Sequence, residues 1–379
     1  MKKYFYFGAL GLLIFEILNV YFIMPMPGSQ NMNSLDLAYF LYSWRWAFRS
    51  VFGIMLCLGI TQVFRSGRKW IPAITLLCTT VIVYLFNFKM SADHMFMQAK
   101  NTVFKSQADN QLPGGRLVIG VENNGEARAY PIQFLAYHHQ VRDTIGGKPV
   151  MVTYCSVCRT GRVYEPLVNG KPETFRLVGM DHYNAMFEDA NTGSWWRQST
   201  GEAVEGRLKG KTLPEIYSQQ MTVDKWFEMY PQGKVMQADE SSVDNYDPLA
   251  RFEAGKSLGN LTRTDSLSWK DKSWVLGIQR GNLSKAYNWN DLKKKRIIND
   301  VIGQTPVVMV IATDGKCFAA FERPSSEIFT INHDTLFSGS TKYNFSGRNI
   351  DLPSNRLQPV NAYQEFWHSW KTFHPHTQP

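Results

Sequence analysis

Two cysteines, Cys155 and Cys158, are separated by two residues and directly follow the apolar run from Val150 to Tyr154. Thiols at this spacing can form a disulfide, exchange electrons with another dithiol or bind a thiophilic metal. Gly161 and β-forming residues come next, so the pattern predicts a loop between strands and not the helix N-terminus of a thioredoxin-like site. Because no histidine follows Cys158 and no second Cys-x-x-Cys exists, c-type haem attachment and a four-cysteine zinc ribbon are excluded.

A metal site at the two thiolates needs further donors, and soft sulfur ligands favour copper(I). The nearby segments offer four such side chains, namely His138, His139, Met180 and His182. The two adjacent histidines would point about 100 degrees apart on a helix, so at most one can face the cysteines. The leading hypothesis is a copper-type centre in which Cys155 and Cys158 are thiolate ligands, one or more of these four side chains complete the coordination, and Arg159 offsets negative charge.

Two other functions remain open from the sequence. The first is a thiol-disulfide oxidoreductase with Cys155 as the more exposed nucleophile and Cys158 as the resolving thiol, so whether the chain is an enzyme stays undecided. The second is an interaction scaffold that has a structural disulfide and a Trp-rich surface at Trp195 and Trp196.

A segment after the cysteines interleaves polar residues with large aromatic ones, from Asn184 to Gln198. Small-molecule sites combine apolar walls with a few fixed polar groups. We therefore expect a pocket lined by Arg159, Met186, Asp189, Trp196 and Gln198. A strand and turn that pack two tryptophans into the core explain the same pattern equally well.

The region that must position these residues contains an internal repeat. Val118-Ile119-Gly120-Val121 resembles Val275-Leu276-Gly277-Ile278, and Pro149-Val150 resembles Pro306-Val307, both at a separation of 157 (277 − 120, 306 − 149). At the equivalent positions the second copy has Ala312 and Gly315 for the cysteines, and Lys295 and Arg296 for the histidines. This joint absence suggests that the cysteines and histidines of the first copy work together.

The repeated unit reads as α+β and rich in strands. Asn123-Asn124-Gly125 favours a hairpin turn, Pro131 can begin a helix that runs to about His139, and Pro149 to Tyr154 reads as a buried strand. Helices alternate with strands too rarely for a doubly wound sheet. We expect a membrane anchor over 1–90, a linker over 91–114, a first repeat over 115–240 and a second, degenerate repeat without Cys-x-x-Cys over 241–379.

Three apolar runs, at about 4–25, 47–64 and 70–88, are long enough to cross a bilayer as helices. Lys2-Lys3 precede the first run, and a basic loop at 65–69 separates the other two. Since Lys and Arg concentrate in cytoplasmic loops, the N-terminus is expected inside the cytoplasmic membrane and the soluble region outside it, in the periplasmic or extracytoplasmic space. The net charge of +9 includes the run Lys293-Lys294-Lys295-Arg296, which we interpret as a solvated helix face near anionic headgroups of the membrane lipid, and we expect no nucleic-acid partner. The sequence does not identify a protein partner.

Four motifs occur together in the first repeat, at Tyr154 to Cys158, Met186 to Asp189, Thr192 to Gln198 and Gly201 to Gly206. By these motifs the region from about 115 to 235 resembles the DUF3179 family of bacterial and archaeal proteins. The family often has Pro-Leu between the cysteines and Gly after them, where this chain has Ser156-Val157 and Arg159. The resemblance implies no particular chemistry, but it favours the first repeat as the functional one.

Overall fold

The computed structural model describes residues 1–65 and 67–377 and has an α+β fold with many small antiparallel sheets. Ser66 of the basic loop and the last two residues of the expected second repeat lie outside the described residues. The chain divides into two compact units. Unit 1 contains residues 1–97, 174–197 and 202–211, and unit 2 contains residues 98–173, 198–201 and 212–379. Residues of the expected first repeat thus belong to both units.

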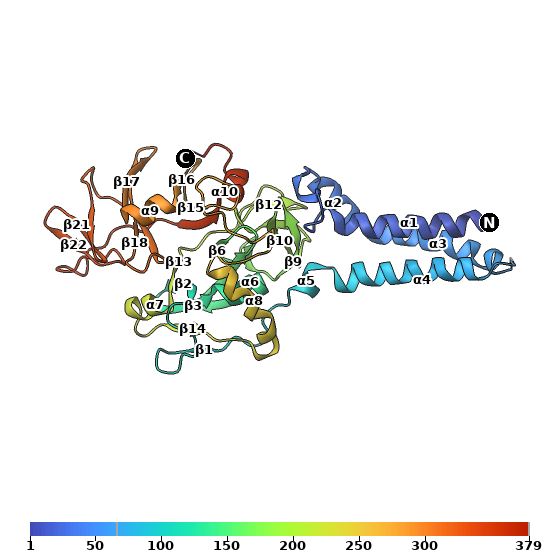
Figure 1. Ribbon diagram of the computed structural model, residues 1–379, viewed down its shortest axis with the longest axis horizontal. Helices are drawn as coiled ribbons and strands as arrows, with labels where there is room; N and C mark the ends of the chain where they lie inside the picture. Colours follow the sequence, from blue (N-terminus) through green and yellow to red (C-terminus); the bar gives the residue numbers. More distant parts are fainter. Residues whose placement is uncertain (66, 378–379) are drawn as a thin grey trace. The chain divides into compact units, whose positions relative to one another are not determined.

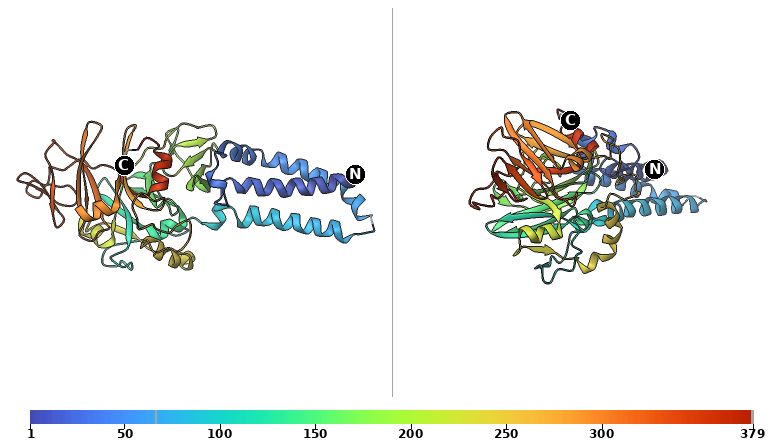
Figure 2. Two further views of the ribbon diagram at one scale, coloured as in Figure 1. Left: turned by 45° about the horizontal axis from the view of Figure 1, so that its top comes forward. Right: turned by 60° about the vertical axis from the view of Figure 1, so that its left-hand side comes forward.

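Unit 1 begins with three long apolar helices that run alongside one another (Figures 1 and 2). They are α1 (Lys2–Tyr21), α3 (Arg45–Phe64) and α4 (Trp70–Tyr84), and a π-helical turn over Leu85–Lys89 extends α4. Each 20-residue span is long and apolar enough to cross a membrane. At Gly8 and Gly59 a Cβ atom would come within 2.6 Å of the backbone of the facing helix, so these glycines let α1 and α3 approach closely.

One buried polar cluster links these three helices. The Arg49 guanidinium donates to both carboxylate oxygens of Glu16, at 2.7 and 2.9 Å. Asn87 accepts from Arg49 at 2.5 Å and donates to Glu16 at 3.0 Å. Polar groups within apolar helices are costly unless they are paired, and here each helix supplies one member of the cluster.

Shorter elements and one sheet complete unit 1. Tyr39 and Tyr42 of α2 pack against the Trp195 ring, and the Tyr39 hydroxyl donates to the Gly193 carbonyl at 3.1 Å. The sheet has the order β12-β11-β10-β9. The elements are a 3-10 turn (Ser29–Asn31), α2 (Leu35–Ser43), α5 (Ala92–Met95), β9 (Phe175–Asp181), β10 (Asn184–Asp189), β11 (Trp195–Arg197) and β12 (Ala203–Glu205).

Unit 2 has a first half built from a hairpin, a short helix and three further strands. The hairpin, the helix and the strand before Cys155 were predicted from the sequence, whereas the strand over Gln140–Ile145 was not. Gly125 has φ = +80° in the hairpin turn, where a side chain would be strained. Pro131 precedes the helix as its N-cap residue instead of occupying the first turn. The elements are β2 (Leu117–Asn123), β3 (Glu126–Pro131), α6 (Ile132–His138), β4 (Gln140–Ile145), β5 (Lys148–Cys155) and β6 (Thr160–Tyr164).

The second half repeats this order of elements. They are β15 (Trp274–Arg280), β16 (Leu283–Asn288), α9 (Trp289–Lys295), β17 (Ile297–Ile302), β18 (Thr305–Ile311) and β19 (Phe318–Glu322). The strand registers also correspond, because Gly120 pairs with Ala129 and Gly277 with Ala286, each 157 positions later. Both short helices end at a residue in the left-handed region, His139 (φ 61°) and Arg296 (φ 65°).

Each half is completed by a strand and helix that come later in the chain. In the first half these are β13 (Gln219–Thr222) and α7 (Val223–Met229); in the second they are β23 (Ala362–Phe366) and α10 (Trp367–Phe373). Thr222 pairs with Leu117, and Phe366 pairs with Trp274, so this segment corresponds at a separation of 144 (366 − 222). The Gln220 side chain donates to that of Gln364, its own counterpart, at 3.1 Å.

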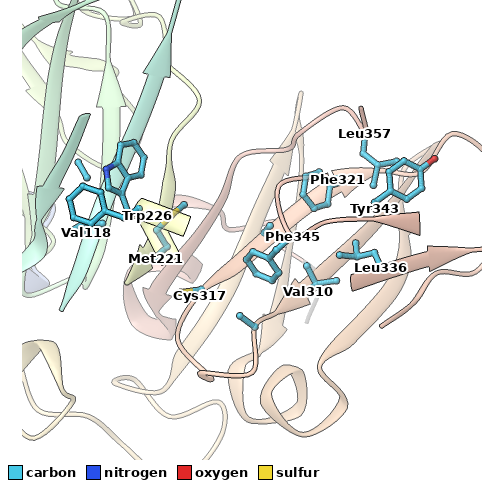
Figure 3. Packing of buried hydrophobic residues seen from close by; sticks show 14 of the residues in the cluster. Val118, Met221, Trp226, Val310, Cys317, Phe321, Leu336, Tyr343, Phe345 and Leu357 are labelled. Carbon is cyan, nitrogen blue, oxygen red and sulfur yellow. The ribbon is translucent and has the colours of Figure 1, made fainter. Parts of the chain in front are cut away.

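A shared hydrophobic core joins the two halves of unit 2 (Figure 3). Met221 and Trp226 of the first half belong to the same buried cluster as Cys317, Phe321 and Phe345 of the second. The remaining elements of unit 2 are β1 (Phe104–Lys105), β7 (Leu167–Val168), β8 (Lys171–Pro172), β14 (Lys234–Met236), a 3-10 turn (Glu240–Ser242), α8 (Val243–Glu253), β20 (Thr330–Asn332), β21 (Thr335–Ser338) and β22 (Thr341–Tyr343).

Candidate functional site

The two cysteines lie in the loop between β5 and β6, as the sequence predicted. Cys155 is the last residue of β5 and pairs with Thr160, the first residue of β6. Both Cys155 and Cys158 are 0% exposed. The expectation that Cys155 is the more exposed of the two is therefore wrong, because the loop is covered by the second half of unit 2.

Three contacts from the second half close this loop. The Phe366 backbone N–H donates to the Cys158 carbonyl at 2.9 Å. The Lys272 ammonium donates to the Val157 carbonyl at 3.0 Å, and His368 Nε2 lies 3.2 Å from the same oxygen. Lys272 Nζ and His368 Nε2 are themselves 3.0 Å apart. The Val157 and Cys158 carbonyls are thus bound by residues of β23 and α10 and by Lys272, which lies two positions before β15.

Burial and neighbouring groups determine the acidity of the site. Burial raises the pKa of the Cys158 thiol well above its usual value, and hydrogen bonding and charge from Cys155 act in the same direction. Burial also lowers the pKa of Lys272, while the charges of Cys158 and Cys155 oppose that shift. The pKa of His368 falls to about 4 because the ring is buried and lies beside Lys272. Cys158 is consequently held as a neutral thiol at neutral pH.

A buried ion pair lies next to the cysteine loop. The Arg162 guanidinium donates to Glu365 Oε2 at 3.0 Å, and both side chains are almost fully buried. Ser369 donates to the other oxygen of Glu365 at 2.5 Å. Arg162 also donates to the Ser199 carbonyl at 3.2 Å and stacks over the Tyr363 ring, with its guanidinium carbon 3.3 Å from the ring centre. Glu365 and Ser369 both act on Cys158, the charge of Glu365 raising its pKa and the Ser369 hydrogen bond lowering it.

The corresponding loop of the second half has a different chemical character. Ala312 and Gly315 replace the two cysteines, and Ala319 replaces Arg162, at the common separation of 157 (319 − 162). Met221 stands at the position equivalent to Glu365, 144 residues earlier, and belongs with Ala319 to the shared hydrophobic core. We call the contact between the cysteine loop and the second half the first interface, and the equivalent contact between the 312–315 loop and the first half the second interface. The first interface is therefore polar at the positions where the second is apolar.

The histidines and methionine expected to complete a metal site have other contacts. His138 Nε2 lies 2.5 Å from the Tyr246 hydroxyl, and His139 Nδ1 lies 3.0 Å from the Tyr137 carbonyl. His182 lies between Asp181 (2.6 Å) and Asn33 (3.1 Å). Met180 and His182 belong to unit 1, on or next to β9, whereas the cysteines belong to unit 2. Within residues 1–65 and 67–377, no group of three or more His, Cys, Asp or Glu side chains is placed to hold a metal ion.

Of the expected pocket residues, the two in unit 2 support the cysteine loop. Arg159 is buried, donates to the Phe252 and Glu253 carbonyls at 3.0 and 2.8 Å, and stacks over the Trp274 ring. The Arg159 guanidinium therefore holds the C-terminal end of α8. Gln198 donates to the Thr153 hydroxyl and the Thr160 carbonyl, at 3.0 and 3.2 Å, and so bridges β5 and β6 on either side of the loop.

The other three expected pocket residues lie in unit 1 and organise a turn. Asp189 accepts from the Thr192 backbone N–H at 2.6 Å and from the Trp196 indole at 2.9 Å. Met186 and both tryptophans are buried, with Trp195 fully enclosed. The interpretation of Trp195 and Trp196 as an exposed interaction surface is therefore wrong, because the strand and turn pack these rings into a core.

Four residues of the site escaped the sequence analysis: Lys272, Glu365, His368 and Ser369. They come from the second half, which had been regarded as the part without chemistry. Glu365, His368 and Ser369 could have been noticed because the segments around Trp226 and Trp370 resemble each other in sequence. This likeness aligns the buried charged residue Glu365 with the apolar residue Met221.

The fold and the site define an α+β protein that has three N-terminal helices long and apolar enough for a membrane and a buried pair of cysteines between two halves of similar topology. The chain belongs to the DUF3179 family, described as protein of unknown function, whose model matches residues 98–377. The match extends beyond the region that showed the resemblance in sequence and includes the second half of unit 2. No curated protein and no solved structure is significantly similar to the chain.

Proposed function

We propose that this chain is a membrane-anchored extracytoplasmic protein in which Cys155 and Cys158 act as a gated thiol-disulfide couple. The observation that carries this proposal is the contrast between the two equivalent interfaces of unit 2. Only one has paired sulfurs, and the same one has a buried Glu365, a Ser369 and a Lys272 around them. An inert bridge needs no charged group beside it, and the second interface, which has no paired sulfurs, has Met221 and Ala319 at the positions of Glu365 and Arg162.

The proposed reaction is exchange with a partner disulfide. One thiol of the pair, once deprotonated, attacks a sulfur of the partner, and the other thiol then displaces the partner from the mixed disulfide. The Cys155–Cys158 bond forms, the partner disulfide breaks, and two electrons and two protons pass to the partner, which leaves as two thiols. Lys272 stabilises the thiolate by its charge, in agreement with the direction in which the sulfurs affect its pKa.

The geometry of the loop controls whether a partner disulfide can reach the sulfurs of Cys155 and Cys158. Because both sulfurs are buried, exchange requires the loop to leave Phe366, Lys272 and His368. Breaking these contacts costs free energy, so the closed loop reacts slowly and an open one reacts quickly. This predicts a low resting rate that rises when the contacts are weakened.

Alkylation of the reduced full-length protein in detergent tests the gate. We expect His368→Ala, which removes the ring 3.2 Å from the Val157 carbonyl and keeps the Lys272 charge, to accelerate modification of Cys155 and Cys158 by a maleimide at least tenfold, measured peptide by peptide by mass spectrometry. His333→Ala is the matched control, because this histidine of the second half is exposed and lies outside the cysteine loop. Equal rates in the two variants would show that these contacts do not gate the loop.

Equilibration in glutathione redox buffers tests the chemistry itself. An exchange-competent couple should titrate near the poise of an oxidising compartment. A reduction potential below about −300 mV would mark Cys155 and Cys158 as a structural bridge and overturn the proposal.

A second candidate is binding of copper(I) by the same two thiolates. Soft sulfur donors select this ion, and two sulfurs without a third clustered donor suit a low coordination number better than the four ligands of zinc. Titration of the reduced protein with copper(I) distinguishes the two functions. Saturation at one ion per chain, lost in the Cys155→Ser and Cys158→Ser double variant, would favour the metal.

The proposed anchoring and origin have separate support. The basic residues at the N-terminus and between α3 and α4 favour a cytoplasmic location for both segments. Three crossings then place the residues that follow α4 and its π-helical extension outside. The matched element order, strand register and Gln220–Gln364 contact support a tandem duplication in unit 2. Protease protection of the N-terminal helices in sealed vesicles tests the first point.

A further inference from the structure

A second feature of unit 2 lies where the two halves meet, away from the shared hydrophobic core. It is a cavity of about 540 Å³ lined by the 212–217 segment, the 359–363 segment and the turn between β15 and β16. Glu215 and Pro359 occupy equivalent positions in it, because each forms a bridge with the end of the corresponding strand, at Tyr164 and Phe321. The volume falls in the range of small-molecule sites, which is about 300–1,000 Å³.

The formal charges on the cavity wall are already balanced by protein partners. Glu215 accepts from the Tyr363 hydroxyl and lies 3.8 Å from the Arg162 guanidinium. Arg280 forms a close ion pair with Glu322. A ligand that carried a net charge would have to compete with these pairs, so the wall favours an uncharged one.

The wall also carries neutral hydrogen-bonding groups. Asn361 Oδ1 is buried and has no hydrogen-bond partner among the described residues, although the same side chain hydrogen-bonds Glu215. The Asn361 side chain therefore adds an amide to the lining beside the Glu215 carboxylate. Thr212 and Tyr217 add hydroxyl groups, and Pro359 adds an apolar surface.

The Glu215 carboxylate is surrounded by protein atoms and yet remains partly exposed to solvent. Protein atoms surround it, and this burial raises its pKa. Its side chain nevertheless keeps 34% of its surface exposed, which is the condition of a group that faces a cavity open to solvent. A hydroxyl donor entering the cavity can therefore reach it.

We propose that this cavity binds a neutral, hydroxyl-rich molecule of the saccharide class. Saccharide hydroxyls both donate and accept, which matches the amide, hydroxyl and carboxylate groups of the wall, and a pyranose ring has an apolar face that suits Pro359. The site is distinct from the cysteine loop, although Arg162 contacts both through Glu365 and Glu215. The proposal does not depend on the redox function.

Calorimetric titration of the full-length protein in a non-glycosidic detergent tests the site. The neutral probes are glucose, N-acetylglucosamine, maltose, cellobiose and chitobiose, and the charged probes are citrate, glucose 6-phosphate and spermidine. We expect saturable binding of at least one neutral probe and at least tenfold weaker binding of the charged ones. Saturable binding of a charged probe alone, or of no probe, would overturn the proposal.

Two substitutions locate the bound probe. Asn361→Leu removes the amide from the cavity lining and should weaken binding at least tenfold, whereas Asn260→Leu, the same change at an exposed position outside the cavity, should leave it unchanged. Thr212→Val removes one hydroxyl with little change of shape and provides a second measurement if Asn361→Leu fails to fold. Binding that survives both cavity variants would place the probe elsewhere and contradict the assignment.

Discussion

Replacement of Glu365 by methionine, the residue at the equivalent position 221, tests the polar interface directly. Glu365 is 0% exposed and holds the buried Arg162 at 3.0 Å. Removing one partner leaves the Arg162 charge buried with carbonyl, hydroxyl and ring contacts and with Glu215, at 3.8 Å, as its remaining carboxylate neighbour. Breaking a buried ion pair in this way costs about 3–5 kcal/mol. We therefore expect Glu365→Met to lower the free energy of unfolding of unit 2 by that amount.

The double variant Arg162→Met with Glu365→Met should cost less than Glu365→Met alone. It removes the stranded charge, and its main remaining loss is the hydrogen bond to the Ser199 carbonyl, worth about 1–3 kcal/mol if that oxygen stays buried. Asp271→Met is the control, because its ion pair with Lys371 is exposed and should contribute at most about 1 kcal/mol.

Urea unfolding of the full-length protein in detergent, followed by tryptophan fluorescence, measures these differences. The reasoning fails if the double variant loses at least as much stability as Glu365→Met alone, because removal of the Arg162 charge would then recover nothing. It also fails if Glu365→Met behaves like the exposed control.

Three other predictions concern buried groups. Burial lowers the pKa of His139 from 6.5 to about 4, so the unfolded chain binds more protons between these values, and acidification from pH 6.5 to 4 should remove about 3 kcal/mol of stability. His139→Asn, which tolerates the left-handed backbone, should reduce that slope in urea unfolding by the His139 share and leave the share of His368, and an unchanged slope would contradict it. Glu16→Leu should lower the thermal unfolding midpoint in detergent, because Arg49 then stays buried without its carboxylate; an unchanged midpoint would show that the cluster is not stabilising. Gly120→Ala should cost about 1–3 kcal/mol, because its Cβ would lie 2.3 Å from an indole ring, whereas Gly115→Ala meets only a flexible lysine end and should cost under about 0.5 kcal/mol; equal denaturant midpoints would refute this packing.

Local features of unit 2 could be predicted because they depend on short-range physics. The Asn-Asn-Gly turn, the helix after Pro131 and the buried strand before Cys155 all appear where backbone preference and apolar runs place them. The three apolar helices follow from length and hydropathy in the same way. The pocket that we expected around Trp196 could not be inferred securely from the residue pattern, because buried tryptophans and pocket-lining tryptophans have the same spacing in a strand.

The sequence by itself determined that the chain has a pair of thiols in a loop between strands, three helices fit for a membrane and two segments that resemble each other at a fixed separation. Only the tertiary structure decided what surrounds the thiols. Glu365, Ser369 and Lys272 reach them from positions more than a hundred residues later in the chain, and His138 and His139, which are much closer in sequence, bind Tyr246 and Tyr137 instead. The physical reason is that each loop is covered by the opposite half, so the partners of a residue are set by the interface between the halves and not by its neighbours along the chain.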